Sequence, residues 1–504
     1  MKHLPRREFV KSLASVPLAF AASRYARAQA RYATDWNSLD QRPVPSWYAE
    51  SKFGIFIHWG VYAVPSYAPP KVKGETPYAE WYWHSLTEGK KAKAPGEDGY
   101  HTWQFHRRVY GPNFEYQDFA RLFRAELFDP DHWADVFSRS GARYVALTSK
   151  HHEGFTLWRS AEANRSWGRP WNAVDIGPRR DLLAELTEAG RRRGLHMGIY
   201  YSLYEWYNPL WLSDRARYVT EHMMPQFKDV VSHARPDVIF SDGEWDLSSD
   251  EWHAPELLAW LYNESPAREL VVVDDRWGKD TRHKHGGYFT TEYTSGMSQS
   301  AHPWEENRGM GYSYGYNRAE TLADYRTSRE LLMMLLDIVS RGGNLLLDIG
   351  PTADGRIPVI MEERLIQIGD WLRPNGAAIH GTRPWKRSRQ WSDGQVPKLE
   401  EKEFMSDYPI GDLVDTPRSG FARVEAFFTA KGNTVYAILP HKPASEVVLT
   451  DLAPRAGMTA TLLATQQKLS WTPRANGIAL RIPESVLASL LRTEAYVIEL
   501  AGAA

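Results

Sequence analysis

Short apolar runs alternate with longer amphipathic segments from about residue 47 to residue 379. In residues 181–193, for example, Leu182, Leu183, Leu186 and Ala189 fall on one face of a helix, and residues 218–231 repeat that pattern. The apolar runs are residues 53–58, 144–149, 196–202, 237–242, 270–275, 288–292 and 344–349. This alternation predicts repeated strand-helix units built on a parallel sheet.

Several of the predicted strands end in polar or ionisable residues. They are His58, Lys150 with His151 and His152, Asp242, Asp275 with Arg276, and Glu292. The strands of a parallel barrel all end at the same mouth, so residues far apart in sequence meet there around one cavity. We therefore expect a (β/α)8-like barrel over residues 31–384, with the chemistry at one rim.

The pattern changes after Pro384, where short alternating strands and turn residues follow one another. Residues 424–439 read as a hairpin with its bend at Lys431, Gly432 and Asn433, and a C-terminal β-sandwich over residues 385–504 is expected. Within the barrel, residues 84–115 are polar and too long for an ordinary connection. This segment is expected to form a structured loop or lid near the rim.

The first thirty residues resemble a twin-arginine export signal. Arg6 and Arg7 precede an apolar run over residues 13–22, and a small-residue motif ends at Ala30. We expect residues 1–30 to be removed after Ala30 and the protein to be periplasmic or secreted; the alternative is a buried N-terminal helix. No later segment approaches the roughly 20 apolar residues that a membrane span requires, so a soluble mature protein is expected.

Charge and composition narrow the classes of partner. The formal net charge of −1 gives no overall field that would attract nucleic acid or an anionic membrane, so neither is expected as a partner. The chain contains no Cys, which excludes disulfides, thiolate nucleophiles and Cys-ligated metals. Aromatic residues make up 13% of the chain, a content that suits stacking against sugar rings but also large hydrophobic cores.

Two carboxylates stand at predicted strand ends. Asp242 follows an apolar run and precedes Gly243, and Glu292 ends the run of residues 288–292. A helix cap or turn Asp, and a solvated loop Glu, are the alternative interpretations. A retaining glycosidase needs two carboxylates about 5 to 5.5 Å apart, one ionised to attack and one protonated to donate.

Metal and nucleotide chemistry lack their usual motifs. The chain has no His-Glu-x-x-His helix, EF-hand loop or Gly-rich phosphate loop, and no cofactor is expected. On a straight strand His151 and His152 point to opposite faces, which disfavours a shared metal. If the chain turns there, both imidazoles could donate to sugar hydroxyls, while Arg276 and Glu80 could bind vicinal diols.

Several blocks together resemble one known family. They are residues 53–60 (FGIFIHWG), 80–82 (EWY), 149–155 (SKHHEGF), 241–245 (SDGEW), 275–278 (DRWG), and 342–344 followed by 350–351. In this order they are similar to glycoside hydrolase family 29, the α-L-fucosidases, from about Trp47 to Trp385. The similarity covers the predicted barrel.

This resemblance implies a retaining exo-hydrolase that releases L-fucose from the non-reducing ends of glycans. Asp242 would be the nucleophile and form a covalent fucosyl intermediate, without a metal. The implied partner is a fucosylated oligosaccharide or glycoconjugate. The residues implied to hold the sugar are His58, Glu80, Trp81, His151, His152, Tyr200, Arg276 and Tyr314.

The acid/base residue has two candidates, Glu292 and Glu305. Glu292 is preferred because its Thr-Glu-Tyr context resembles the bacterial members, and Glu305 stays an alternative. Other functions left open are a catalytically silent fucose- or glycan-binding protein and a barrel glycosidase for another sugar. The sequence leaves open the preferred linkage, the balance between hydrolysis and transfucosylation, and whether the protein is a homo-oligomer.

Overall fold

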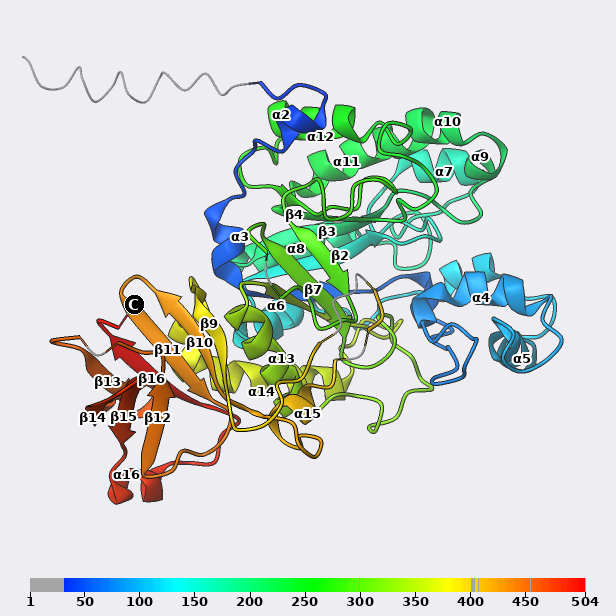
Figure 1. Ribbon diagram of the computed structural model, residues 1–504. Coiled ribbons are helices and arrows are strands. Elements are labelled where there is room, and N and C mark those ends of the chain that lie inside the picture. Colours follow the sequence, from blue (N-terminus) through cyan, green and yellow to red (C-terminus); the bar gives the residue numbers. More distant parts are fainter. Residues whose placement is uncertain (1–30, 299, 400–403, 407, 454, 504) are drawn as a thin grey trace, which may run out of the picture.

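The computed structural model describes residues 31–504 except residues 299, 400–403, 407, 454 and 504. The expected export signal, residues 1–30, lies outside the described residues. Two eight-stranded sheets organise the chain, one parallel and one antiparallel, and Figure 1 shows them side by side. The predicted fold class, a (β/α)8-like barrel followed by an all-β domain, is confirmed.

The parallel sheet follows the order β5-β4-β3-β2-β1-β8-β7-β6. Its strands are β1 (Phe53–Ile57), β2 (Tyr144–Lys150), β3 (His196–Ser202), β4 (Val238–Asp242), β5 (Val272–Val273), β6 (Phe289–Glu292), β7 (Trp304–Gly309) and β8 (Asn344–Ile349). The sheet curls until its edges meet, because the backbone N–H groups of Gly287 and Tyr288 donate to the carbonyl of Val273 at 2.9 and 3.2 Å. All the strands therefore end at one mouth.

One strand, β7, was absent from the sequence prediction. Its residues Glu305, Glu306, Asn307 and Arg308 are polar, so no apolar run marks it, yet the whole strand is buried. Internal partners make this burial tolerable. Glu306, for example, accepts hydrogen bonds from the hydroxyls of Thr291 (2.5 Å) and Thr294 (3.1 Å).

Helices cover the outside of the barrel, although the described residues form none between β5 and β6 or between β6 and β7. The α-helices of this part are α2 (Trp36–Leu39), α3 (Ser46–Ser51), α4 (Tyr82–Gly89), α5 (Tyr100–Val109), α6 (Pro130–Arg139), α7 (Ala161–Trp167), α8 (Leu182–Arg192), α9 (Pro209–Ser213), α10 (Arg215–Arg217), α11 (Met224–Ala234), α12 (Ala254–Asn263), α13 (Ser328–Ser340) and α14 (Val359–Asn375). Short 3-10 turns η1 (Val61–Ala63), η2 (Ala79–Trp81), η3 (Tyr116–Arg121) and η5 (Gly376–Ala378) and a π-helical turn η4 (Tyr218–Met223) complete them.

Helix α8 matches its prediction to one residue at each end, with Asp181 as its N-cap. The segment 84–115, expected as a loop or lid, contains most of α4 and all of α5.

The antiparallel sheet follows the order β12-β15-β14-β13-β16-β11-β10-β9. Its strands are β9 (Arg383–Trp391), β10 (Val424–Lys431), β11 (Thr434–Leu439), β12 (Glu446–Thr450), β13 (Thr459–Leu462), β14 (Gln467–Arg474), β15 (Gly477–Arg481) and β16 (Tyr496–Ala501), with α15 (Ile410–Val414), η6 (Leu463–Thr465) and α16 (Glu484–Ser489) between them. The predicted hairpin is confirmed, since Lys431 of β10 pairs with Thr434 of β11. The sheet folds back on itself, because Gln390 of β9 donates to the carbonyl of Val448 in β12 at 2.9 Å. The expected boundary at residues 384 and 385 falls inside β9.

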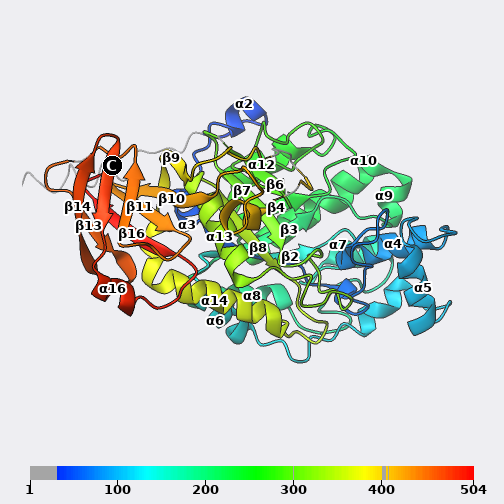
Figure 2. The ribbon, with the colours of Figure 1, turned by 60° about the horizontal axis from the view of Figure 1, so that its bottom comes forward.

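The second sheet packs against α13 and α14, as Figures 1 and 2 show from two directions. A buried ion-pair cluster fixes this junction: Asp337 of α13 contacts Arg389 of β9 at 2.5 Å and Arg341 at 2.9 Å. Tyr408, from the connection between β9 and β10, donates its hydroxyl to the same carboxylate at 2.6 Å. The junction thus anchors the connection that later approaches the barrel mouth.

None of the helices in the described part of the chain combines the length and the apolar character needed to cross a bilayer.

Candidate active site

A cavity of about 420 Å³ opens at the carboxyl ends of the barrel strands. Every residue given a preferred site role from the sequence lines it: His58, Glu80, Trp81, His151, His152, Tyr200, Asp242, Arg276, Glu292 and Tyr314. They come from strands and loops throughout the barrel, so the curled parallel sheet is what brings them together.

Asp242 is the last residue of β4 and points into the cavity. Its Oδ2 accepts a hydrogen bond from the Tyr200 hydroxyl at 2.8 Å, and its Oδ1 lies 3.2 Å from Nη1 of Arg276. Burial alone would raise the pKa of Asp242, but the charge of Arg276 leads the opposing interactions, which hold the pKa well below its ordinary value. Asp242 is therefore ionised at neutral pH, the state that a nucleophile requires.

The turn after Asp242 depends on glycine. Gly243 has φ +73°, and a Cβ on it would lie 2.3 Å from a ring carbon of Tyr204. A side chain here would displace either Tyr204 or the strand end.

Arg276 joins the two candidate catalytic carboxylates. Its Nη1 contacts Asp242, while its Nη2 lies 3.0 Å from Oε2 of Glu292, the last residue of β6. The guanidinium is held in place by Nε, which donates to the Thr290 hydroxyl at 3.0 Å, and by the ring of Phe240, whose centroid is 4.7 Å away. One rigid, buried fork thus fixes the positions of both acids.

Adjacent His151 and His152 both line the cavity, with ring centroids 4.2 Å apart. The straight-strand expectation is wrong here, because β2 ends at Lys150 and the chain turns, with the Gly154 amide donating to the His151 carbonyl at 3.0 Å. The alternative with a turn is what occurs. Burial lowers the pKa of His152 well below its usual value, so that imidazole is neutral and can donate or accept toward a ligand.

The opposite wall is built by His58, Glu80 and Tyr314. His58 contacts Asp348 through Nδ1 at 2.7 Å and stacks on the ring of Tyr314 at 4.7 Å. The carboxylate of Glu80 accepts from the Gly315 amide at 2.8 Å, and burial raises the pKa of Glu80. These groups place hydrogen-bonding atoms beside a flat apolar surface.

The alternative acid/base, Glu305, lies outside this cavity. It stands near the amino end of β7, paired in register with Asn344, the first residue of β8. Its Oε2 accepts from the hydroxyls of Tyr144 (2.5 Å) and Tyr48 (2.9 Å) inside the barrel. Burial raises the pKa of Glu305 to about 7. Glu305 is therefore at the closed end of the barrel, whereas Glu292 is at the open mouth.

Sequence reasoning missed part of the lining. The additional residues are Phe56, Tyr78, Phe240, Trp245, Arg282, Asn307 and Phe404. Phe56 and Phe240 lie two residues before His58 and Asp242 on their strands, so period-two alternation could have found them. No comparable signal marks Phe404, which comes from the connection between β9 and β10.

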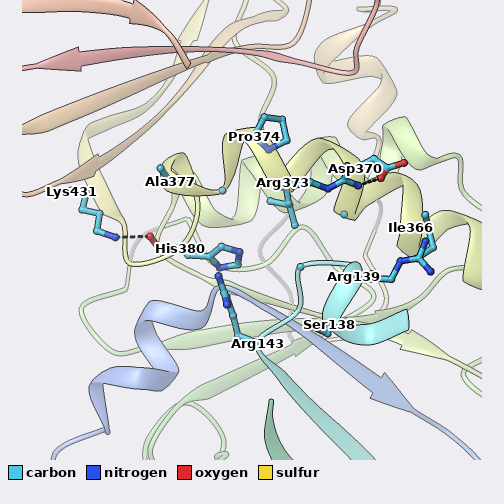
Figure 3. Close-up of a pocket in the computed structure, with 14 residues that line it drawn as sticks. Ser138, Arg139, Arg143, Ile366, Asp370, Arg373, Pro374, Ala377, His380 and Lys431 are labelled. Carbon is cyan, nitrogen blue, oxygen red and sulfur yellow. Dashed lines mark hydrogen bonds and ion pairs between the residues drawn. The ribbon is translucent and has the colours of Figure 1, made fainter. Parts of the chain in front are cut away.

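A larger hollow, of about 720 Å³, lies near the amino end of β2 (Figure 3). Its polar lining is mainly basic, with Arg139, Arg143 and Lys431 among it. Asp370 is the one carboxylate among the described residues that line it, and it is paired with Arg373. Since this hollow cannot supply two facing acids, the smaller cavity is the candidate active site.

Among the described residues, no group of three or more His, Asp or Glu side chains is arranged to hold a metal ion.

Comparison with known proteins shows the family of this chain. A family model described as alpha-L-fucosidase matches residues 19–377, which include the whole barrel and every candidate site residue. The chain belongs to the alpha-L-fucosidase family. It is therefore a glycoside hydrolase.

Relatives in this family match almost the full length of the chain. An alpha-L-fucosidase of Branchiostoma floridae is 41% identical over 94% of this chain and 96% of its own length. Human tissue alpha-L-fucosidase is 39% identical over 96% of this chain and 95% of its own length. Among solved structures, Thermotoga maritima alpha-fucosidase is 34% identical, with a TM-score of 0.74 over 94% of this chain and all of that chain.

Proposed function

We propose that this protein is a retaining exo-α-L-fucosidase that cleaves terminal α-L-fucose from oligosaccharides or glycoconjugates. The observation that carries the mechanism is the fork of Arg276, which contacts Asp242 and Glu292 at once. A guanidinium that contacts both carboxylates holds them at the same cavity mouth, within reach of one sugar ring, and this is the arrangement of two acids that a retaining enzyme uses.

In the first step Asp242 attacks the anomeric carbon while Glu292 gives its proton to the glycosidic oxygen. The bond between that carbon and oxygen breaks, the leaving group departs as an alcohol, and a covalent fucosyl-Asp242 ester remains. In the second step Glu292 takes a proton from water, the water oxygen attacks the same carbon, and Asp242 is released as a carboxylate. Two inversions leave the anomeric configuration unchanged.

The shape of the cavity supports an exo-acting enzyme for a 6-deoxy sugar. Phe56 and Phe240 close its inner end and are almost completely buried, so a chain cannot pass through it. His58, His151 and His152 offer hydrogen-bonding atoms for ring hydroxyls, and the aromatic surfaces suit a methyl group. A solved structure of the Thermotoga maritima alpha-fucosidase in complex with fucose shares 34% identity with this chain, which supports the same sugar.

Product stereochemistry and a substrate panel test this proposal. We expect the enzyme to hydrolyse an aryl α-L-fucoside and to leave the other aryl glycosides intact. The first product seen by NMR should be α-L-fucose. Asp242→Ala should lose activity, and mass spectrometry of the wild type with a mechanism-based inhibitor should show the label on Asp242. The β-anomer as the first product would contradict the retaining mechanism. If no aryl glycoside is hydrolysed, the result would favour a sugar-binding protein without turnover.

Export is a separate part of the proposal, because it depends on residues 1–30 alone. We propose that the twin-arginine-like segment directs the folded protein across the membrane, so that it acts in the periplasm or outside the cell. Cell fractionation tests this: replacing Arg6 and Arg7 by Lys should retain the full-length protein in the cytoplasm. The same distribution before and after the change would contradict export by this route.

A further inference from the structure

The lining of the active-site cavity divides into a deep part and a rim. Tyr200, Phe240 and Phe56 at the bottom are about 1% exposed, whereas Phe404 and Trp245 are 49% and 40% exposed. If the terminal sugar fills the deep part, the group attached to it must pass through the rim.

Phe404 reaches the rim from the second domain. The backbone amide of Met405 donates to the carbonyl of Glu292 at 3.0 Å, and Phe404 forms a β-bridge with Glu292. The Tyr78 hydroxyl contacts Sδ of Met405 at 3.1 Å, which ties the same segment to the barrel. The proposed proton donor acts on the oxygen between the two sugars. A side chain that flanks Glu292 on its solvent side therefore faces the leaving group.

Trp245 stands on the nucleophile side of the rim, three residues after Asp242. Its ring stacks on Trp81, with centroids 6.0 Å apart and planes at 29°. Tyr204 packs against it edge-on at 5.6 Å. These contacts fix the orientation of the indole while leaving much of its surface to solvent.

Arg282 supplies a polar group at the same rim. Its Nε donates to Oε1 of buried Glu244 at 2.7 Å, and its side chain is 18% exposed. Within the described residues, its two Nη atoms make no hydrogen bond to the protein. The Arg282 guanidinium is thus held in place through its Nε, and the N–H groups of its two Nη atoms can donate to a ligand.

We propose that Phe404, Trp245 and Arg282 form a leaving-group subsite that binds the pyranose ring to which the fucose is attached. The proposal rests on the function proposed above. Flat aromatic surfaces suit the C–H face of a pyranose, and the Arg282 donors suit its hydroxyls. A small aromatic rim with a fixed polar group fits one sugar ring better than a peptide or a lipid.

The test compares a substrate that has a sugar leaving group with one that has none. The two substrates are α-L-fucosyl-(1→2)-galactose and α-L-fucosyl fluoride, and the readout is the ratio of their kcat/KM values. We expect the ratio to fall about tenfold in Phe404→Ala and in Arg282→Gln, and to recover to within about threefold of wild type in Phe404→Trp. Val396→Ala, an exposed change on the same connection but outside the cavity, is the matched control and should leave the ratio unchanged.

Failure of the subsite and failure of the proposed function give different results. A wild-type ratio in both Phe404→Ala and Arg282→Gln, with both substrates cleaved, would overturn the subsite alone. A wild-type enzyme that cleaves neither substrate would overturn the fucosidase function and the subsite with it. A fall in the ratio that Phe404→Trp does not restore would show that the aromatic ring is not what binds the leaving group.

Discussion

Nη1 of Arg276 lies 3.2 Å from Oδ1 of Asp242, and both side chains are buried at the barrel mouth. The pair explains how a carboxylate in a largely apolar pocket stays ionised, because the guanidinium charge opposes the effect of burial on its pKa. The same contact makes a pH-dependent prediction.

Removing the charge in Arg276→Gln should raise the pKa of Asp242. Since the nucleophile must be ionised, the acid limb of kcat/KM should move to higher pH, and kcat/KM at its optimum should fall by about 10² or more. The measurement is the pH profile of kcat/KM with an aryl α-L-fucoside.

Arg276→Lys is the matched control for this change. It keeps the charge but loses the planar pair of nitrogens that contacts the two carboxylates separately, so its activity should fall while its acid limb stays near that of the wild type. An acid limb that does not move in Arg276→Gln would contradict the role given to the Arg276 charge.

The positions of Glu292 and Glu305 at opposite ends of the barrel predict opposite effects on catalysis. Glu292→Gln should lower kcat/KM for a fucosyl disaccharide by about 10² to 10⁴, because the leaving group loses its proton donor. Glu305→Gln should stay within about threefold of wild type, since it lies outside the cavity. Azide rescue of Glu292→Ala checks the assignment. Rescue of Glu305→Ala but not of Glu292→Ala would reverse it.

Glu305 should instead make stability depend on pH. Burial raises its pKa in the folded state to about 7, above the value of about 4.3 for an unfolded chain. The folded state therefore binds more protons than the unfolded state between these values. This contribution is fully present below about pH 4 and is lost as the pH rises through 7.

Glu305→Gln cannot ionise and should not show this loss. We expect the free energy of unfolding of the wild type, relative to this variant, to drop by about 2 to 4 kcal/mol between pH 5 and pH 8. Urea unfolding of both proteins at the two pH values measures it. Parallel curves across the range would show that Glu305 is already ionised at pH 5.

A buried network beneath the two adjacent histidines predicts a large loss of stability. Glu205 contacts Nζ of Lys150 at 2.9 Å and Nε2 of His222 at 2.7 Å, and Lys150 and Glu205 are fully buried. Glu205→Gln leaves the Lys150 charge without its counterion, so we expect about 3 to 5 kcal/mol of destabilisation by urea unfolding.

Glu221→Gln provides the comparison for Glu205. Its partner Arg217 lies at 2.9 Å, but both side chains are more than half exposed. Because water screens this pair, the loss should be far smaller than that of Glu205→Gln. Equal losses in the two variants would mean that the Lys150 charge finds another partner or solvent.

The chain pattern alone was enough to predict the barrel and the place of its site. Apolar runs that end in His58, Asp242 and Glu292 indicate parallel strands with polar carboxyl ends, and a barrel necessarily brings such ends together. The hairpin at residues 431–433 was also predictable, since its turn residues and alternation are local signals.

The tertiary structure determined the positions of residues that local sequence patterns do not encode. Glu305 and Glu292 look alike in sequence, but pairing in the sheet puts one at the amino end of β7 and the other at the carboxyl end of β6. Strand β7 itself lacks an apolar run, because its buried polar groups are satisfied by residues far away in the chain, such as Tyr48 and Tyr144. Phe404 reaches the cavity only because a connection of the second domain pairs with the end of β6. Long-range pairing, rather than local preference, fixed these positions.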